Sequence, residues 1–184
     1  MIEESPNVGK AVETAVLAEE EANLRLGDGL TIFARAWVPP APQRVVACIQ
    51  GLGGHGAYYR PLAHALAQEG TALAAPDLRG HGRSEGTRGT IDSFKRYLED
   101  VDATLRWVQA SWPGKPIILL GESMGASIAI QYIASKHTQS GKVPLAGLAL
   151  VSPVLRPAIQ PTISEAVRYL HFLLTAPSRP AMPV

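Results

Sequence analysis

The pentapeptide Gly121-Glu122-Ser123-Met124-Gly125 has the residue types and spacing of a nucleophilic serine, in a G-x-S-x-G pattern. It follows the apolar run Ile117–Leu120 and precedes the helix-like stretch 126–130. This context predicts a strand, a sharp turn and a helix, an arrangement that presents a serine for acyl transfer. Gly121 and Gly125 would remove side-chain clashes inside such a turn. We therefore expect the Ser123 hydroxyl to stand above the edge of the sheet.

Two backbone amides are the expected stabilisers of the oxyanion that forms when such a serine attacks. The helix that begins at Met124 would point its free amides and the positive end of its dipole at the serine hydroxyl. A second donor is expected from the glycine-rich loop that follows the apolar run 44–49, with the Leu52 amide as the best candidate. The other residues of this oxyanion loop are Gln50, Gly51 and Gly53. Loss of one such donor typically costs about 100- to 1000-fold in rate.

A serine nucleophile also needs a histidine base and a carboxylate that orients the base. The sequence after Ser123 contains no Asp, a single Glu, Glu165, and two histidines, His137 and His171. Glu165 and His171 lie six residues apart on one expected helix, which places them on different faces. We therefore expect this chain to lack the catalytic acid and histidine.

Several reactive side chains that precede the serine are expected to be structural. Asp77 and His81 form a tempting Asp–His pair, but they lie in the connection before the nucleophile, and we expect them to stabilise that loop. His55, in the oxyanion loop, is likewise expected to stabilise its loop rather than to take part in catalysis. Cys48 lies in an expected buried strand, where it would be a small core residue.

The elements that must position Ser123 alternate between strands and helices along the chain. A β-hairpin is expected around the turn Gly27-Asp28-Gly29, with strands over 23–26 and 30–38. Further strands are expected over 44–49, 71–75, 116–120 and 145–151, and helices over 58–69, 90–109 and 124–137. The expected buried helix positions are Leu62, Ala65 and Leu66 in the first helix, and Phe94, Leu98, Val101, Leu105 and Val108 in the second. This alternation predicts an α/β fold with a mostly parallel sheet and helices on both faces.

The composition is that of one globular domain and excludes several classes of function. The 184 residues are 46% hydrophobic and 18% charged, and the net charge of +1 gives no electrostatic reason to bind nucleic acid or an anionic membrane. Cys48 is the only cysteine, which rules out an intrachain disulfide and a cysteine zinc cluster and favours a reducing, cytoplasmic location. We expect neither a signal peptide nor a transmembrane span from the sequence.

The chain is expected to have three parts. Residues 1–21 form a polar lead-in, residues 22–154 form the core, and the proline-rich residues 155–184 form the start of a helical cap or a tail. The last core strand, over 145–151, is apolar on both faces, and no further strand is expected beside it. Because an unpaired apolar edge attracts other strands, self-association through this edge is expected.

Several segments together resemble a known family. They are Gln50–Gly56, Tyr59-Arg60, Ala75–Gly86 with its Asp-Leu-Arg-Gly-His-Gly-Arg-Ser run, and the pentapeptide at Ser123. From about residue 23 to about residue 160 the chain looks like the monoacylglycerol lipase and lysophospholipase branch of the α/β-hydrolases. One departure is Gln50-Gly51, where family members usually carry His-Gly; a glutamine amide could also hold the loop.

The resemblance implies an α/β-hydrolase fold, truncated at the start of the cap. It implies that Ser123 is the acyl nucleophile, that the Leu52 and Met124 amides form the oxyanion hole, and that the catalytic acid and histidine follow the cap. The implied activity is hydrolysis of monoacylglycerol or lysophospholipid esters, small-molecule lipid substrates, with no cofactor and no metal. The alternative is a fragment or non-catalytic chain that binds acyl ligands or a partner.

Overall fold

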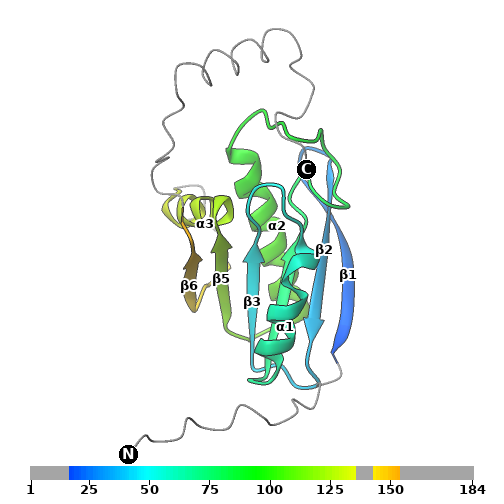
Figure 1. The fold of residues 1–184 in the computed structure, drawn as a ribbon, viewed down its shortest axis with the longest axis vertical. Helices are drawn as coiled ribbons and strands as arrows, with labels where there is room; N and C mark the ends of the chain where they lie inside the picture. The colour runs from blue at the N-terminus through cyan, green and yellow to red at the C-terminus, as the bar shows by residue number, and fades with distance from the viewer. Residues whose placement is uncertain (1–16, 136–142, 154–184) are drawn as a thin grey trace, which may run out of the picture.

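The computed structural model describes residues 17–135 and 143–153 (Figure 1). Within them the chain forms a six-stranded sheet in the order β1-β2-β4-β3-β5-β6. The strands are β1 (Ala18–Arg25), β2 (Thr31–Val38), β3 (Arg44–Ile49), β4 (Thr71–Pro76), β5 (Ile117–Glu122) and β6 (Gly147–Val151). Strands β3 to β6 run parallel, whereas β2 is antiparallel to both of its neighbours. The expected mostly parallel α/β sheet is therefore confirmed.

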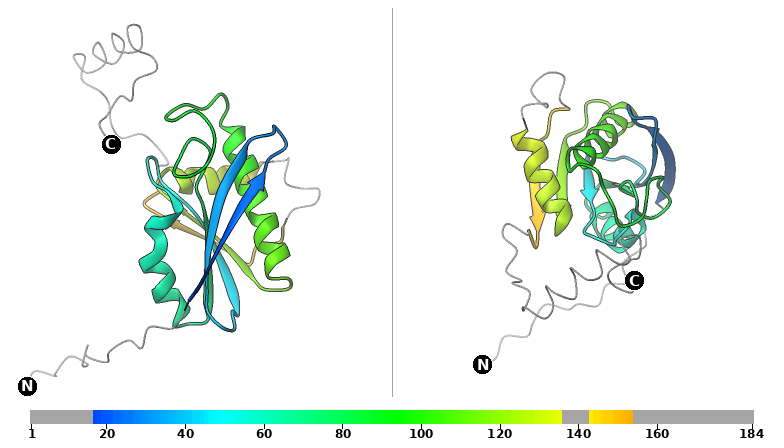
Figure 2. Two further views of the ribbon diagram at one scale, coloured as in Figure 1. Left: turned by 90° about the vertical axis from the view of Figure 1, so that its right-hand side faces the viewer. Right: turned by 90° about the horizontal axis from the view of Figure 1, so that it is seen from above.

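Helices cover both faces of this sheet. They are the 3₁₀ helix η1 (Gly56–Tyr59) and the α-helices α1 (Arg60–Ala67), α2 (Lys95–Ser111) and α3 (Met124–Ala134). Figure 2 shows α1 on one side of the strands and α2 on the other. The buried side chains of α3 join the same core as those of α2. Strands β3 and β4 are consequently buried on both faces, which explains their continuous apolar sequences.

Each face of the sheet has its own core. On the α2 face, Val101, Leu105 and Val108 are fully buried against strand residues such as Leu119, as their helical spacing predicts. The core on the other face consists of Trp37, Cys48, Ala63, Leu73 and Ala75, with Leu62 and Leu66 packed against it. Cys48 is therefore a core residue, as expected. In α1 the buried positions are Ala63 and Ala67, whereas Ala65 is exposed, contrary to expectation, because the helix turns its 63/67 row toward the sheet.

The start of α2 differs from the expected one. The helix begins at Lys95 rather than at Thr90, and Phe94 is 36% exposed instead of buried. The Ser93 hydroxyl accepts a hydrogen bond from the Lys95 amide at 3.3 Å, so Ser93, not Thr90, supports the first turn. Tyr97 is an additional core residue, which the apolar spacing of this helix did not predict.

Strand β1 begins earlier than expected. It starts at Ala18, five residues before Asn23, and so reaches into the segment 1–21 that was expected to be a lead-in. The three acidic residues Glu19–Glu21 are exposed, because an edge strand turns part of its backbone and side chains toward water. The hairpin itself forms as predicted, with the Leu26 amide donating to the Leu30 carbonyl at 2.8 Å.

A buried arginine fastens the loop after β4 to two other elements. The Arg79 guanidinium donates to the Asp100 carboxylate of α2 at 2.6 and 2.8 Å, and to Asp28 of the hairpin turn at 2.8 Å. The hydrogen bond from Arg79 lowers the pKa of the Asp28 carboxyl below its ordinary value. This network joins the β1–β2 hairpin, the loop after β4 and α2.

The expected cap or tail over 155–184 lies outside the described residues, as do His137, Glu165 and His171. In the part of the chain that the structure describes, no helix has both the length and the apolar character needed to cross a membrane.

Candidate active site

Ser123 lies at the sharp turn between β5 and α3, as predicted. Its backbone has φ 52° and ψ −113°, a left-handed conformation that is uncommon for a residue other than glycine. Such strained backbone persists only where the surrounding structure holds it, and it clusters at functional sites. The turn therefore has the geometry of a nucleophile elbow.

The two glycines of the pentapeptide let this turn pack closely. A Cβ atom on Gly121 would lie 2.5 Å from the Gly125 carbonyl oxygen. A Cβ atom on Gly125 would fall on the carbonyl oxygen of Ile49, at the end of β3. Because both contacts are with backbone, neither can be relieved by moving a side chain. Gly121 and Gly125 thus allow β5, α3 and β3 to converge at Ser123.

Some backbone amides around Ser123 donate a hydrogen bond within the protein, and others do not. The Ser123 amide donates to the Val151 carbonyl at 2.9 Å, which ties the elbow to β6. Within the described residues, the Met124 and Leu52 amides donate no hydrogen bond. The Met124 amide is unbound because it belongs to the first turn of α3, where no earlier carbonyl faces it. These two amides remain available to a ligand.

The oxyanion loop lies against the elbow. A Cβ atom on Gly51 would be 3.3 Å from the Cβ of Ser123, so the loop backbone passes directly beside the serine. Gln50 is fully buried, and its Nε2 donates to the Gly54 carbonyl at 2.6 Å. Gly53 has φ 74°, which a side chain would strain. A glutamine amide therefore does hold this loop, at the position where the resemblance leads one to expect histidine.

A hydrogen bond that the sequence did not predict joins η1, the 3₁₀ helix that follows this loop, to the pentapeptide. The Tyr59 hydroxyl donates to Oε2 of Glu122 at 2.5 Å. Burial raises the pKa of the Tyr59 phenol, and the bond to Glu122 raises it further. Side-chain alternation along β5 could have shown that Glu122 faces the α1 side of the sheet, but not that a tyrosine meets it there.

Asp77 and His81 form hydrogen bonds that hold the segment after β4, as expected. The Asp77 carboxylate accepts hydrogen bonds from the Gly56 amide at 2.6 Å and from the Arg83 amide at 2.8 Å. His81 Nδ1 lies 3.0 Å from the Arg79 carbonyl oxygen, to which it donates. Neither side chain forms a hydrogen bond with Ser123 in the described part of the chain.

No histidine among residues 17–135 and 143–153 forms a hydrogen bond with the Ser123 hydroxyl. His55 stacks on Tyr58, with ring centroids 4.2 Å apart. The same residues contain no group of three or more His, Cys, Asp or Glu side chains that could hold a metal ion. The described site thus consists of a serine, two unbound amides and the loop that carries one of them.

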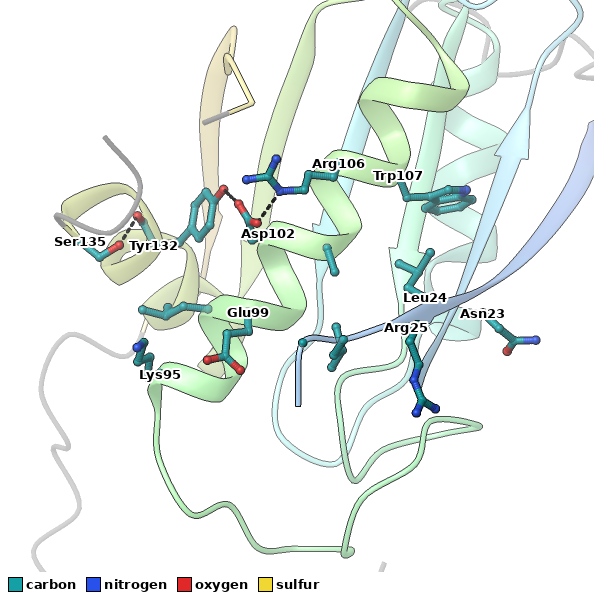
Figure 3. Close-up of a pocket in the computed structure, with 14 residues that line it drawn as sticks. Asn23, Leu24, Arg25, Lys95, Glu99, Asp102, Arg106, Trp107, Tyr132 and Ser135 are labelled. Atoms are coloured by element: carbon teal, nitrogen blue, oxygen red, sulfur yellow. Dashed lines mark hydrogen bonds and ion pairs between the residues drawn. The ribbon is translucent and has the colours of Figure 1, made fainter. Parts of the chain in front are cut away.

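A cavity of about 710 Å³ lies away from this site, between β1, α2 and the C-terminal end of α3 (Figure 3). Its polar centre is Asp102, which accepts hydrogen bonds from Tyr132 at 2.9 Å and from Arg106 at 2.7 Å. No residue of the pentapeptide or of the oxyanion loop lines it. This cavity is therefore separate from the chemistry at Ser123.

Comparisons with known proteins agree with the α/β-hydrolase fold. Residues 40–181 match the family model described as serine aminopeptidase, S33. The mouse (Mus musculus) monoglyceride lipase is 34% identical over 151 residues, which are 80% of this chain and 48% of that protein. Phospholipase YtpA of Bacillus subtilis is 31% identical over 120 residues, 65% of this chain and 44% of that protein. A solved lipase in its open form superposes with a TM-score of 0.65 and 27% identity, over 89% of this chain and 54% of the lipase. The chain spans about half the length of the curated relatives it matches.

Proposed function

The chain belongs to the serine aminopeptidase S33 family, with an α/β-hydrolase fold of the monoglyceride lipase type, and we propose that it carries the nucleophile of a serine ester hydrolase. Ser123 attacks the carbonyl carbon of a carboxylic ester, the alcohol leaves, and water then releases the acid from the acyl-serine. The Leu52 and Met124 amides stabilise the oxyanion of both steps. The observation that carries this proposal is the left-handed Ser123 between β5 and α3, packed against Gly51.

The proposed substrate is a monoacylglycerol, with a lysophospholipid as the second candidate. The mouse relative is named a monoglyceride lipase, and the Bacillus subtilis relative is named a phospholipase. Both substrate classes present a fatty acyl ester of glycerol, so the same attack by Ser123 serves either one. The chemistry requires no cofactor and no metal. Comparing release of fatty acid from monooleoylglycerol and from lysophosphatidylcholine distinguishes the two.

The expected rate of ester hydrolysis depends on whether a base accepts the proton of the serine hydroxyl. Without a histidine base, an alcohol is a weak nucleophile at pH 7. In a well-studied serine protease, loss of the base costs on the order of a million-fold in turnover, and the remaining site still exceeds water by roughly a thousand-fold or more. We therefore propose that this chain lacks the catalytic acid and histidine and that, by itself, it turns esters over only weakly.

The test uses the purified 184-residue chain, p-nitrophenyl acetate and a fluorophosphonate probe that reacts with activated serines. Slow turnover and slow labelling, both abolished in Ser123→Ala, support the proposal. Labelling that persists in Ser123→Ala, or none in the wild type, contradicts it. Turnover at the rate of a complete hydrolase would contradict the absence of a base and would direct attention to His171 or His55.

A second function, binding of a partner without catalysis, is favoured by the outer edge of β6. This strand pairs only with β5 among the described residues, and it exposes Leu148, Leu150 and Val151 by 40%, 38% and 47%. We propose self-association through this edge. Light scattering should detect oligomers that Leu150→Lys reduces, and a monodisperse wild type would exclude self-association.

We also propose a cytoplasmic location, since the single cysteine, Cys48, is a buried thiol.

A further inference from the structure

We propose that Tyr59 and Glu122 are positioning residues that hold the oxyanion loop against the nucleophile elbow. The inference rests on the proposed function, because it concerns the same acyl transfer at Ser123. Tyr59 is the last residue of η1, and Glu122 immediately precedes Ser123. The 2.5 Å hydrogen bond between them spans 63 residues of sequence and joins the helix that follows the oxyanion loop to the pentapeptide.

The sheet brings this pair together on the face that α1 covers. Strands β3 and β5 are parallel neighbours, with Cys48 opposite Leu120. Glu122 lies two residues beyond Leu120 and therefore projects to the same face as Cys48. Tyr59 packs against the core on that face, next to Cys48. The pair thus meets at the carboxyl end of β5, next to the turn that carries Ser123.

Three side-chain hydrogen bonds hold the oxyanion loop and the helix η1 that follows it. Gln50 bonds within the loop itself, through its buried amide. The Gly56 amide bonds to Asp77, which ties the end of the loop to the segment after β4. Of the three, only the Tyr59–Glu122 bond reaches the pentapeptide. Van der Waals packing also joins the loop to this turn, at Gly51 beside Ser123 and at the Gln50 carbonyl beside Gly125.

The chemistry of the pair makes this bond persistent. A phenol that donates to a carboxylate forms a charge-assisted hydrogen bond, roughly twice as strong as a neutral one. Burial raises the pKa of Tyr59, so the phenol keeps the proton that the bond requires. Burial also raises the pKa of the neighbouring Cys48 thiol to about 12, so no thiolate forms beside the pair at neutral pH.

Loss of this bond should slow acylation more than it weakens binding. The loop would keep its ties to Gln50 and Asp77, but the Leu52 amide would no longer be held at a fixed distance from Ser123. An oxyanion donor acts mainly in the transition state, where charge develops, so its displacement lowers the rate constant and leaves ground-state affinity nearly unchanged. A misplacement of about 1 Å can cost up to roughly 100-fold.

The test measures the rate of Ser123 labelling by the fluorophosphonate probe in the full chain, at several probe concentrations. Tyr59→Phe removes the donor and keeps the ring, and Glu122→Leu removes the acceptor. Each is expected to lower the limiting labelling rate roughly 10- to 100-fold without changing the half-saturating probe concentration. The double variant should be no slower than either single one, because both remove the same bond.

Two matched variants separate positioning from general damage. Glu122→Gln keeps an oxygen that accepts the hydrogen bond from the Tyr59 hydroxyl, so its labelling rate should stay within a few-fold of the wild-type rate. Tyr58→Phe removes the neighbouring hydroxyl, which is on a side chain 65% exposed, and should change nothing. Circular dichroism confirms that each variant is folded under the labelling conditions.

Each outcome is decisive. Labelling of folded Tyr59→Phe at the wild-type rate, or additive losses in the double variant, overturns the positioning role. A loss in Glu122→Gln as large as that in Glu122→Leu also overturns it, since the hydrogen bond survives in the first. Failure of the proposed function looks different, because the wild type would then label no faster than Ser123→Ala.

Discussion

The loops that follow the neighbouring strands β3 and β4 use their polar groups in opposite ways. After β3, the Leu52 amide donates no hydrogen bond within the described residues, and its side chain is 70% exposed. After β4, Asp77 and Arg79 are buried, and their charged groups bond to backbone amides and to carboxylates from other elements.

This difference shows where function should be sought. The loop after β4 carries the residues that look most catalytic in the sequence, an aspartate and a histidine, yet their hydrogen-bonding groups are engaged in holding the loop. The loop after β3 carries few reactive side chains, but it leaves the Leu52 amide unbound in a segment that passes beside the strained serine at Gly51. Buried polar groups that are already paired stabilise a fold, whereas an unpaired donor at a strained turn is available to a ligand.

The largest effect on stability is expected from the loop after β4. Asp100→Ala leaves the buried Arg79 guanidinium without its main partner, and breaking a buried ion pair costs about 3–5 kcal/mol. Chemical denaturation should show this loss in the free energy of unfolding. Asp92→Ala, which removes an exposed i,i+4 partner of Arg96, is the control and should cost less than about 1 kcal/mol. Equal losses in the two variants would mean that the buried network has no special role.

The largest effect on activity is expected from the loop after β3. Leu52→Pro removes the amide hydrogen, whereas Leu52→Ala changes only an exposed side chain. If this amide is an oxyanion donor, Leu52→Pro should slow labelling of Ser123 by about 100- to 1000-fold, and Leu52→Ala should not. Folding of the proline variant is checked by circular dichroism. Equal labelling by folded proline and alanine variants would remove Leu52 from the oxyanion hole.

The elbow could be predicted from the sequence because its determinants are local. Five consecutive residues, an apolar run before them and a helix-forming stretch after them specify the turn at Ser123. The glycine loop is local in the same way. The mostly parallel sheet follows from the alternation of strands and helices, and the hairpin follows from its Asp-Gly turn. Short-range signals of this kind can be recognised in the sequence without knowledge of the packing.

The features that could not be predicted depend on contacts between distant segments. The Tyr59–Glu122 bond requires the pairing of β3 with β5 and the orientation of η1. At α2, Thr90 and Ser93 are both acceptable cap residues, and the residue types alone do not show at which one the helix begins. The acidic residues of β1 conceal its strand, because an edge position removes the alternation that usually reveals one.

A smaller effect is expected from His81, which tests whether the loop after β4 takes any part in the chemistry. His81→Ala removes the hydrogen bond to the Arg79 carbonyl and buried packing near Tyr97, so it should lower stability by about 1–2 kcal/mol. Labelling of the folded protein at Ser123 should be unchanged. His64→Ala, on α1, is the control and should stay within about 0.5 kcal/mol of the wild type. A loss of labelling without a loss of stability would give His81 a role at the serine.

The smallest effect is an alkaline loss of stability to which one tyrosine near each loop should contribute, Tyr59 in η1 after β3 and Tyr97 in α2 near the loop after β4. Burial raises the pKa of Tyr59, after β3, and of Tyr97, which packs near His81. The unfolded tyrosines titrate near pH 10, so between that pH and the higher folded pKa the folded state binds more protons. The stabilisation is therefore complete below about pH 10 and decreases as the pH rises further, by at most about 1.4 kcal/mol per pH unit for each tyrosine. Denaturation at pH 8 and pH 10.5 should show a smaller decrease in Tyr59→Phe and in Tyr97→Phe than in the wild type. If the decrease were as large in both variants as in the wild type, neither phenol would be buried as described. If it were as large as in the wild type only in Tyr59→Phe, Tyr97 alone would contribute, and the two tyrosines would differ in this property.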